Sequence, residues 1–361
     1  MEYKIHYEPL YDWESIAILT NILNGKSIKD ERENIIKRRG SRHKPTITRF
    51  FKNSLILEAH IKKNIKYDMP GYEDNGKQLA NFLFEKSDNP EFPLINAIFY
   101  YNQLLSGGMD NKEISILSVL SGNDVDELDL FVERGGLLTT ITPKEFFFEL
   151  EKCPATDTEK LNAIRLYHDF NLYLDYATAL LAQVESLIKQ KYSPTELTAT
   201  MNTIKSNFEA DSIAFLRDTF NIVLDDTHKL MVYPSLYKVN SLSAWGTCLT
   251  DLLNIFIGSH ILELIESFKD AEADNNQIES FIKSISDNTK LSILKLLKDS
   301  PMYGSQLAEK LNCTSANISH HMSELLSLGV IHVEKENNRT YLHLNKDVIN
   351  QYLDDAKSLF N

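Results

Sequence analysis

The stretch that decides the fold is residues 286–345, SDNTKLSILKLLKDSPMYGSQLAEKLNCTSANISHHMSELLSLGVIHVEKENNRTYLHLN. Ser286 or Asp287 can cap a helix at its start by accepting a hydrogen bond from a free backbone N–H group. The segment Asp299–Pro301 ends that helix, because proline cannot continue it. Leucines recur between these points at helical spacing and predict the buried face of the helix: Leu291, Leu294 and Leu297.

A turn and two further helices follow this first helix. Residues 305–311 have a short amphipathic pattern, and the Asn312-Cys313 pair after them is typical of a tight turn. Thr314 can cap a third helix, which Gly329 closes as a C-cap glycine. The order helix, turn, helix predicts a helix-turn-helix unit.

Two alternating runs after the third helix predict a β-hairpin. Val330–Glu334 and Thr340–Leu344 alternate apolar and polar residues, as strands with one buried face do. The residues between them, Lys335–Arg339, are polar and would form the tip. Such a hairpin would be the wing of a winged helix-turn-helix.

Three short motifs stand out in this stretch: SDNTKLSIL at residues 286–294, QLAEKL at residues 306–311 and SANISHHMSELLSLGVI at residues 315–331. Together they resemble the winged helix-turn-helix of the ArsR family of bacterial transcriptional regulators. The resemblance covers the C-terminal part of the chain alone. It implies binding to double-stranded DNA, and it implies a dimer interface formed by the helices that flank the winged unit.

The third helix has an apolar stripe and a polar face. Ile318, Met322 and Leu325 share the stripe, which we expect to pack on the preceding helix. The short polar residues opposite can approach base edges, and the helix N-terminus can bind a phosphate. His321 falls near the buried edge, so a packed role and a DNA contact both stay open. With Arg339, which can reach the DNA backbone or the minor groove from the wing, the predicted DNA-binding residues are Thr314, Ser315, Asn317, Ser319, His320, His321 and Arg339.

Charge separates this stretch from the whole chain. The chain has a net charge of -13 and 43% hydrophobic residues, which fits a soluble globular protein without non-specific affinity for polyanions. The winged stretch is neutral, because acidic residues match its lysines and Arg339 in number. A winged-helix adaptor that binds protein without sequence-specific DNA binding is therefore the alternative function.

Cysteine spacing and hydropathy favour a cytoplasmic protein with no membrane partner. Cys153, Cys248 and Cys313 are isolated and share no disulfide or metal-ligand spacing. The N-terminus has no apolar signal core. The longest apolar run, Leu252–Ile265, is too short to span a bilayer, and we expect it to be a buried or dimerising helix.

The chain before the winged stretch is predicted to be mainly helical. A long helix is expected over Thr156–Lys191, and Leu242–Asp270 is predicted to be helical again. Strand patterns occur at Tyr3–Tyr7 and in a hairpin of Asn221–Leu224 with Lys229–Tyr233. Further helices are predicted at residues 76–85, 93–105, 111–120, 124–134 and 143–152.

The fold class is therefore mainly α, in two domains. Residues 1–270 would be a large helical N-terminal domain with a few short strands, and residues 271–361 the winged helix-turn-helix domain with flanking dimerisation helices. The string MVYPS at residues 231–235 is similar to a strand of larger ArsR-like regulators, which implies that the N-terminal domain senses an effector or dimerises. The last helix has an apolar stripe expected at the dimer interface, with Ile349, Tyr352, Leu353, Leu359 and Phe360.

Residues 29–66 form the one basic segment of this acidic chain. Its densest part, Arg38–Lys44, can contact DNA phosphates or clamp an anionic effector. A solvated loop that balances the acidic body is the alternative interpretation. Both interpretations stay open on sequence alone.

No pattern predicts a catalytic residue, a cofactor or a metal site. The sequence has no phosphate loop, nucleophile elbow, HExxH or paired cysteines. The ArsR resemblance implies metal ligands at two places, where this chain has Met302–Ser305 and a last helix with aspartates but no histidine. We expect a non-enzymatic homodimeric DNA-binding regulator, a repressor on a palindromic operator, that responds to a small organic effector or a protein signal. The chain length also leaves open an enzyme or ligand-binding domain fused to a regulator.

Overall fold

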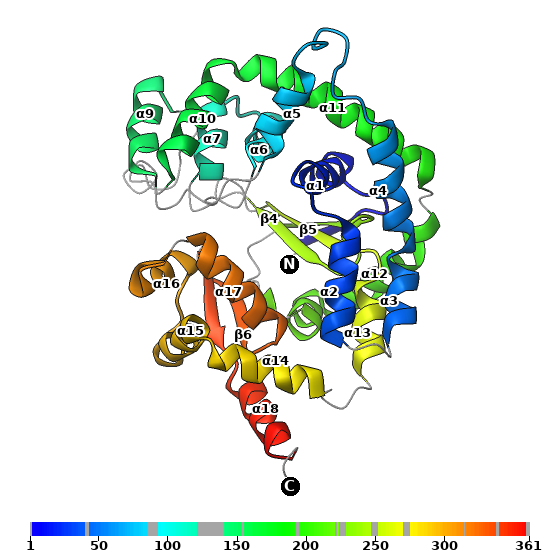
Figure 1. Ribbon diagram of the computed structural model, residues 1–361, viewed down its shortest axis with the longest axis vertical. Helices are drawn as coiled ribbons and strands as arrows, with labels where there is room; N and C mark the ends of the chain where they lie inside the picture. Colours follow the sequence, from blue (N-terminus) through cyan, green and yellow to red (C-terminus); the bar gives the residue numbers. More distant parts are fainter. Residues whose placement is uncertain are drawn as a thin grey trace.

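The computed structural model contains two hydrophobic cores. One is built from residues between Ile16 and Leu264, and the other from residues between Phe281 and Leu342. We call residues 2–269 the N-terminal part and residues 275–358 the winged module. The fold is mainly α, as predicted (Figure 1). The structure describes residues 2–39, 43–85, 93–120, 141–153, 155–192, 195–220, 222–223, 229–246, 252–269, 275–313, 315–336 and 339–358.

The helices of the N-terminal part form an arc around a sheet, and the winged module lies below this arc in Figure 1. Two of them begin with a capping box, in which Thr142 and Glu145, or Thr156 and Glu159, exchange side-chain and backbone hydrogen bonds. The helices are α1 (Tyr11–Leu23), α2 (Ile28–Arg39), α3 (Lys44–Phe50), α4 (Lys52–Asn64), α5 (Gly76–Phe84), α6 (Ile95–Ser106), α7 (Lys112–Leu120), α9 (Pro143–Lys152), α10 (Asp157–His168), α11 (Phe170–Lys191), α12 (Thr195–Phe220) and α13 (Ile261–Lys269).

The sheet at the centre of the N-terminal part has four strands in the order β1-β3-β5-β4. Strand β3 (Lys229–Ser235) runs parallel to both β1 (Glu2–Ile5) and β5 (Leu252–Gly258), and β4 (Leu242–Gly246) runs antiparallel to β5. Strand β5 is buried from its second residue onward, as expected of a strand covered on both faces.

The predictions for residues 76–152 are confirmed where the structure describes them. Helices α5, α6, α7 and α9 occupy the predicted places, and the helix predicted at 124–134 lies outside the described residues. The solvated-loop interpretation concerned Arg38–Lys44, of which residues 40–42 lie outside the described residues, so it stays open for the basic segment 29–66. Its described residues form most of α2, together with α3 and α4. Ile47, Phe51 and Ile61 are fully buried, which anchors this basic segment in the core.

The single helix predicted over 156–191 is wrong, because α10 and α11 meet at a break. Asp169 has φ -106° and ψ 30°, outside the helical range. Aspartate is a weak helix former, so the break costs little at this position. It allows Phe170 and Tyr176 of α11 to be buried in the core.

The helix predicted over Leu242–Asp270 is also wrong, because β4 and β5 occupy its first half. The run Leu252–Gly258 is a short apolar segment, and such a segment fits a buried strand and a buried helix equally well. Backbone packing fixes the end of the strand. A Cβ atom on Gly258 would lie 2.3 Å from the carbonyl oxygen of Lys238 and 2.5 Å from that of Val239.

The predicted hairpin of Asn221–Leu224 with Lys229–Tyr233 is wrong in its pairing. Strand β2 (Ile222–Val223) and strand β3 belong to different sheets. Both segments are strands, as their composition indicated. Alternation identifies a strand but does not specify its partner, and here the partners lie far away in the chain.

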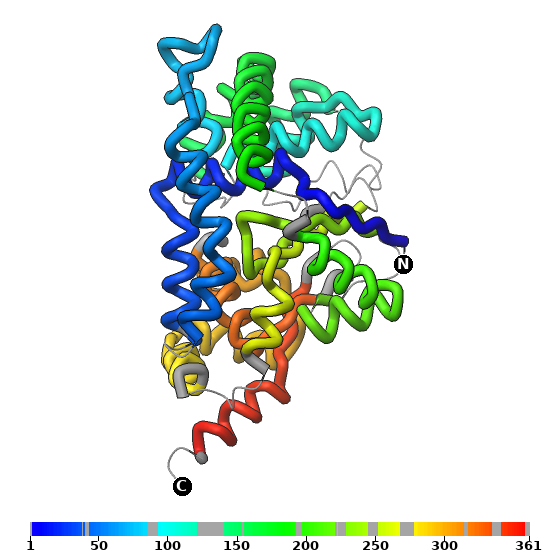
Figure 2. The backbone as a smooth tube through the Cα atoms, turned by 90° about the vertical axis from the view of Figure 1, so that its right-hand side faces the viewer, coloured from blue at the N-terminus to red at the C-terminus, as the bar shows by residue number. Residues whose placement is uncertain are grey.

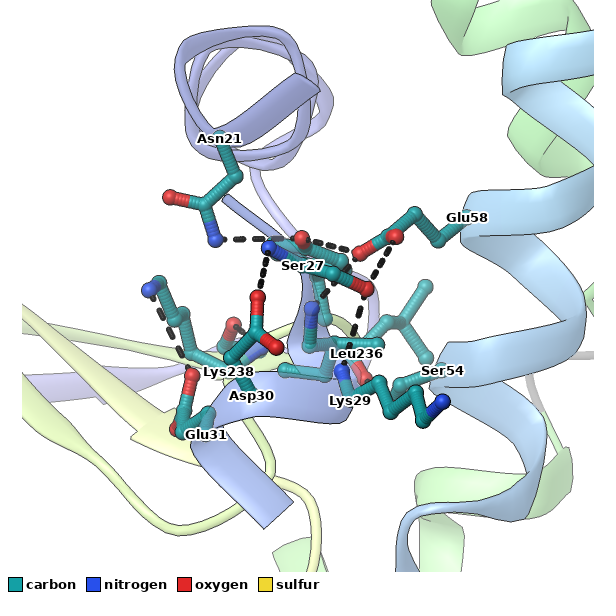
Figure 3. A network of polar contacts seen from close by, with 12 residues as sticks. Asn21, Ser27, Lys29, Asp30, Glu31, Ser54, Glu58, Leu236 and Lys238 are labelled. Carbon is teal, nitrogen blue, oxygen red and sulfur yellow. Dashed lines mark hydrogen bonds and ion pairs between the residues drawn. The ribbon is translucent and has the colours of Figure 1, made fainter. Parts of the chain in front are cut away.

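A buried polar network holds α2 against the turn that follows β3 (Figure 3). Glu58 on α4 is 4% exposed and accepts hydrogen bonds from the Tyr237 hydroxyl at 2.6 Å, the Ser27 hydroxyl at 2.7 Å and the backbone N–H of Ile28 at 2.8 Å. Burial raises the pKa of Glu58, but the hydrogen bonds from Ile28, Lys62, Tyr237 and Ser27 outweigh it and hold this pKa below its ordinary value.

Two further contacts fix the same turn. The carboxylate of Glu14 accepts the backbone N–H groups of Leu236 at 3.2 Å and Tyr237 at 3.0 Å, and burial raises its pKa. The Nζ atom of Lys238 lies 3.7 Å from Oε2 of Glu31 on α2. Helix α2 and the turn after β3 are therefore held together as one wall of the N-terminal part.

Candidate nucleic-acid interface

The winged module forms from local signals that the sequence shows. Asp287 caps α15 by accepting the backbone N–H of Lys290 at 2.9 Å. Asn312 (φ 52°) and Gly329 (φ 71°) adopt the left-handed conformation at the ends of two helices. The elements are α14 (Asn275–Ser286), α15 (Asn288–Asp299), α16 (Gly304–Leu311), α17 (Ser315–Ser327), β6 (Ile331–Glu336), β7 (Arg339–Leu344) and α18 (Lys346–Ser358).

Helix α17 packs on the module through the predicted stripe. Ile318 and Leu325 are fully buried, and Met322 is half-buried against the same core. Leu307 of α16 is fully buried in this core as well. Burial of these side chains fixes the rotation of α17, and therefore which residues face outward.

The wing consists of β6 and β7, which pair antiparallel. Its strands are longer than predicted, because β6 extends to Glu336 and β7 begins at Arg339. The tip is therefore residues 337–338 rather than Lys335–Arg339, and it lies outside the described residues. Met302, before α16, exchanges backbone hydrogen bonds with Leu342 of β7 and ties the wing to the helices.

A strand of the N-terminal part joins the wing. Strand β2 runs parallel to β6, with Ile222 opposite Val333 and Val223 opposite Glu334. The wing sheet therefore has the order β2-β6-β7. The sequence reasoning missed this pairing, since no local pattern distinguishes it from the hairpin that was predicted.

The outward face of α17 carries short polar side chains. Asn317 and His320 are exposed, and Ser319 is half-buried. These side chains lie in the first half of the helix, where a recognition helix contacts base edges. Ser315 begins α17 and Arg339 begins β7, but Thr314 and the side chains of Ser315 and Arg339 lie outside the described parts.

His321 lies on the inner side of the same helix. It is half-buried, and its Nδ1 atom is buried with no hydrogen-bond partner in the part of the chain that the structure describes. The backbone N–H of Lys290 lowers the pKa of Asp287, burial opposes this shift, and the neighbouring His321 lowers the pKa further. These observations support the packed role for His321.

Glu324 connects the outward face of α17 to α15. Its Oε1 atom lies 3.3 Å from Nε2 of His320, and its Oε2 atom forms an ion pair with the ammonium group of Lys290. The sequence reasoning did not include Lys290 or Glu324. The i, i+4 spacing of His320 and Glu324 was a usable signal for the first contact, whereas the second joins residues 34 positions apart.

Helix α14 lies between the two cores. It packs against α2 of the N-terminal part and against α15 and α18 of the module. Phe281 of α14 stacks on Tyr352 of α18, with ring centroids 4.9 Å apart. Ile349 packs partly on the module core, whereas Leu353 is 41% exposed. The other predicted dimer residues, Leu359 and Phe360, lie outside the described residues.

Within the described ranges, no group of three His, Cys, Asp or Glu side chains is placed to hold a metal ion. Among the same residues, no helix is both long enough and apolar enough to cross a membrane.

Comparison with known proteins agrees with this geometry. The family model described as bacterial regulatory protein, arsR family, matches residues 287–333, which run from the cap of α15 into β6. The chain is 35% identical over 72 residues to the transcriptional repressor SdpR of Bacillus subtilis, a match that covers 20% of this chain and 80% of that protein. The helix-turn-helix, the wing and these two matches together show that the chain belongs to the ArsR family of bacterial regulatory proteins.

Proposed function

We propose that this protein is a transcriptional repressor that binds a palindromic operator as a homodimer. The observation that carries this proposal is the outward face of α17, where Asn317 and His320 are exposed on a helix whose rotation is fixed by its buried stripe. Amide and imidazole groups can hydrogen-bond base edges in the major groove. The repressor role is supported by the similarity to SdpR, which is a transcriptional repressor.

The geometry of α18 supports the homodimer. This helix protrudes from the rest of the chain in two perpendicular views (Figures 1 and 2), and it exposes Leu353. A protruding helix with an exposed apolar residue is suited to pairing with a second copy. Two copies of α17 would then meet half-sites about one helical turn of DNA apart, or a multiple of it.

The two hydrophobic cores support the assignment of different functions to the two parts of the chain. We assign DNA binding and dimerisation to residues 271–361 and the sensing of a signal to residues 1–270. Each part has its own hydrophobic cluster, and α14 connects them.

The experiment begins with selection of the operator from random double-stranded DNA by the full-length protein. Affinity for that operator and for an unrelated duplex is then measured by fluorescence anisotropy at several salt concentrations. Asn317→Ala and His320→Ala should each weaken operator binding by about 1–3 kcal/mol with little effect on the unrelated duplex. Arg339→Ala should weaken both and reduce the salt slope by about one per monomer.

Matched controls are available in the N-terminal part. Asn171 and His168 are exposed on α11 and α10, so Asn171→Ala and His168→Ala remove the same chemical groups away from α17. Equal losses on both duplexes for the α17 variants would mean that the helix does not contact bases specifically. Normal binding by all variants would favour the protein-binding adaptor, which the neutral charge of the winged stretch suggests.

The dimer has its own test. Leu353→Asp should give a monomer in light scattering and should weaken operator binding. Leu172→Asp is the control, because Leu172 on α11 is exposed to a similar extent, 42% against 41%. A Leu353→Asp protein that remains dimeric would place the interface elsewhere.

A further inference from the structure

A cavity of about 460 Å³ lies where the N-terminal part meets the winged module. Helices α2 and α13 and the turn after β3 form one wall, and α14, α15 and α17 form the other. Cavities of this size are typical of sites for small organic ligands. The polar network around Glu58 holds the first wall in place, since it fixes α2 and the turn (Figure 3).

Two residues that line this cavity each carry a buried polar atom with no hydrogen-bond partner among the described residues. Ser284 on α14 is 3% exposed, and its Oγ atom is buried and unsatisfied. The Oδ1 atom of Asn240, in the turn after β3, is also buried and unsatisfied. Buried polar groups in folded proteins nearly always have a partner, because an unsatisfied group costs about 1–3 kcal/mol. The two residues come from opposite walls; the Ser284 hydroxyl can donate a hydrogen bond to a molecule between them, whereas the Asn240 oxygen can only accept one.

Positive charge dominates the cavity. Arg39 of α2, Lys283 of α14 and Lys290 of α15 contribute three cations, against one carboxylate from Glu324. That carboxylate is already engaged by Lys290 and lies near His320. An anionic group of a ligand would therefore be attracted, and Ser284 can donate a hydrogen bond to it.

The rest of the lining is largely apolar. Ile35, Ile261, Leu264, Ile265 and Leu328 contribute hydrophobic side chains, which favour a ligand with a hydrocarbon body. On the proposed function as a regulator, we propose that this cavity is the effector site and binds a small organic carboxylate with an apolar body. Arg39 comes from the basic segment for which the sequence left open a clamp on an anionic effector.

The cavity is connected to the DNA-contacting helix through three side chains. A carboxylate bound at Lys290 competes with Glu324 for the ammonium group. Glu324 is then left to hold His320 against the protein, away from DNA. Ligand and operator therefore oppose each other, and each lowers the affinity of the protein for the other by the same factor.

The test uses the full-length protein and straight-chain carboxylates from hexanoate to decanoate together with phenylacetate, each paired with its uncharged amide. Binding is measured by calorimetry and by the rise in melting temperature. We expect at least one carboxylate to bind and its amide to bind roughly tenfold more weakly or not at all. The same carboxylate should lower operator affinity in the anisotropy assay.

Two variants locate the binding. Lys283→Ala removes a cation from the cavity. Ser284→Leu places a larger side chain in the cavity and removes the hydroxyl. Each should weaken carboxylate binding roughly tenfold or more while operator affinity without carboxylate is unchanged. The controls Lys298→Ala on α15 and Ser286→Leu on α14 make the same changes at exposed positions that do not line the cavity.

The experiments distinguish a failure of the proposed effector site from a failure of the proposed repressor function. If no carboxylate binds, or if both cavity variants bind it like the wild type, the effector site is overturned even when operator binding is intact. If the cavity variants abolish carboxylate binding but the wild type shows no sequence-specific DNA binding, the site stands and the repressor function fails.

Discussion

Two strand pairs of this molecule, the β6-β7 hairpin of the wing and the β1-β3 pair of the N-terminal sheet, differ in how far apart their strands lie in the chain. In the wing, β6 and β7 pair across residues 337–338, so that Glu336 lies opposite Arg339. In the N-terminal sheet, Glu2 lies opposite Lys229, and α1 to α12 lie between them. Closing so long a segment requires the helical core to be in place, because loop-closure entropy must be overcome before the strands pair. The β6-β7 hairpin depends on a local connection, whereas the β1-β3 pair depends on packing between distant segments.

The largest expected effect comes from a methyl group added in the N-terminal sheet, and the same addition in the winged module is its comparison. Gly258→Ala places a Cβ atom 2.3 Å from a backbone oxygen that cannot move freely, and it should cost about 3 kcal/mol of unfolding free energy. Gly304→Ala in the winged module meets the flexible Met322 side chain at 3.4 Å and should change stability by less than about 0.5 kcal/mol.

Tryptophan fluorescence makes this pair of variants informative. Both tryptophans, Trp13 and Trp245, lie in the N-terminal part, and Trp13 stacks on Phe256 of β5 at 4.4 Å. Urea unfolding followed by fluorescence should therefore detect the loss in Gly258→Ala. Equal stability of the two glycine variants would contradict the contrast between the tightly packed end of β5 and the start of α16.

A smaller effect is expected from the carboxylate that holds α2 to the turn after β3. Glu58→Gln should cost about 2 kcal/mol at neutral pH, because a charged acceptor of several hydrogen bonds is replaced by an amide. In the folded state the pKa of Glu58 lies below the ordinary glutamate value of about 4.3. The ionised carboxylate therefore adds to the free energy of unfolding at pH values above about 4.3. This stabilisation is lost as the pH falls through the pKa of the folded state.

The difference in stability between the wild type and Glu58→Gln should therefore shrink as the pH is lowered below about 5. Chemical unfolding at a series of pH values measures it. Glu209→Gln on α12 is the control, since Glu209 is exposed and pairs only with the nearby Lys205 in the described structure. If this difference in stability grew at low pH, Glu58 would not be the ionised acceptor that holds α2 to the turn.

The smallest effect is expected where the two regions meet. Val223→Pro removes a backbone N–H from β2 and should lower global stability by less than about 1 kcal/mol, because β2 contributes only two pairs to the wing sheet. Hydrogen exchange of β6 around Val333 should nevertheless become faster. Val223→Ala keeps the backbone N–H, so the amides of β6 around Val333 should exchange in this variant at the wild-type rate. Unchanged exchange in the proline variant would show that β2 does not protect the wing.

Distance along the chain also decides what could be predicted from the sequence. Asp287, Asn312 and Gly329 act on neighbours within a few residues, so the helices of the winged module and the wing could be predicted. The apolar stripe of α17 likewise identified Asn317 and His320 as outward residues. In contrast, Leu252–Gly258 was interpreted as helix, because a short apolar run has no periodicity to distinguish a buried strand.

The parts of the site that were not predicted depend on contacts between distant segments. The pair Lys290 and Glu324 joins two helices, and Ser284 lines a cavity together with residues of α2 and α13 of the other part. Nothing in the local sequence of α14 distinguishes Ser284 from Ser286, which is exposed on the same helix.

Strand β2 has a consequence for attempts to produce the winged module alone. In the whole chain β2 pairs with β6 at Val333 and Glu334, on the side of β6 away from β7, and covers this part of the edge. Residues 275–361 expressed as a fragment would leave the outer side of β6 bare, with unpaired backbone donors and acceptors. Such an edge recruits strands from other molecules and leads to aggregation. We therefore expect this fragment to associate edge to edge more readily than the whole chain does.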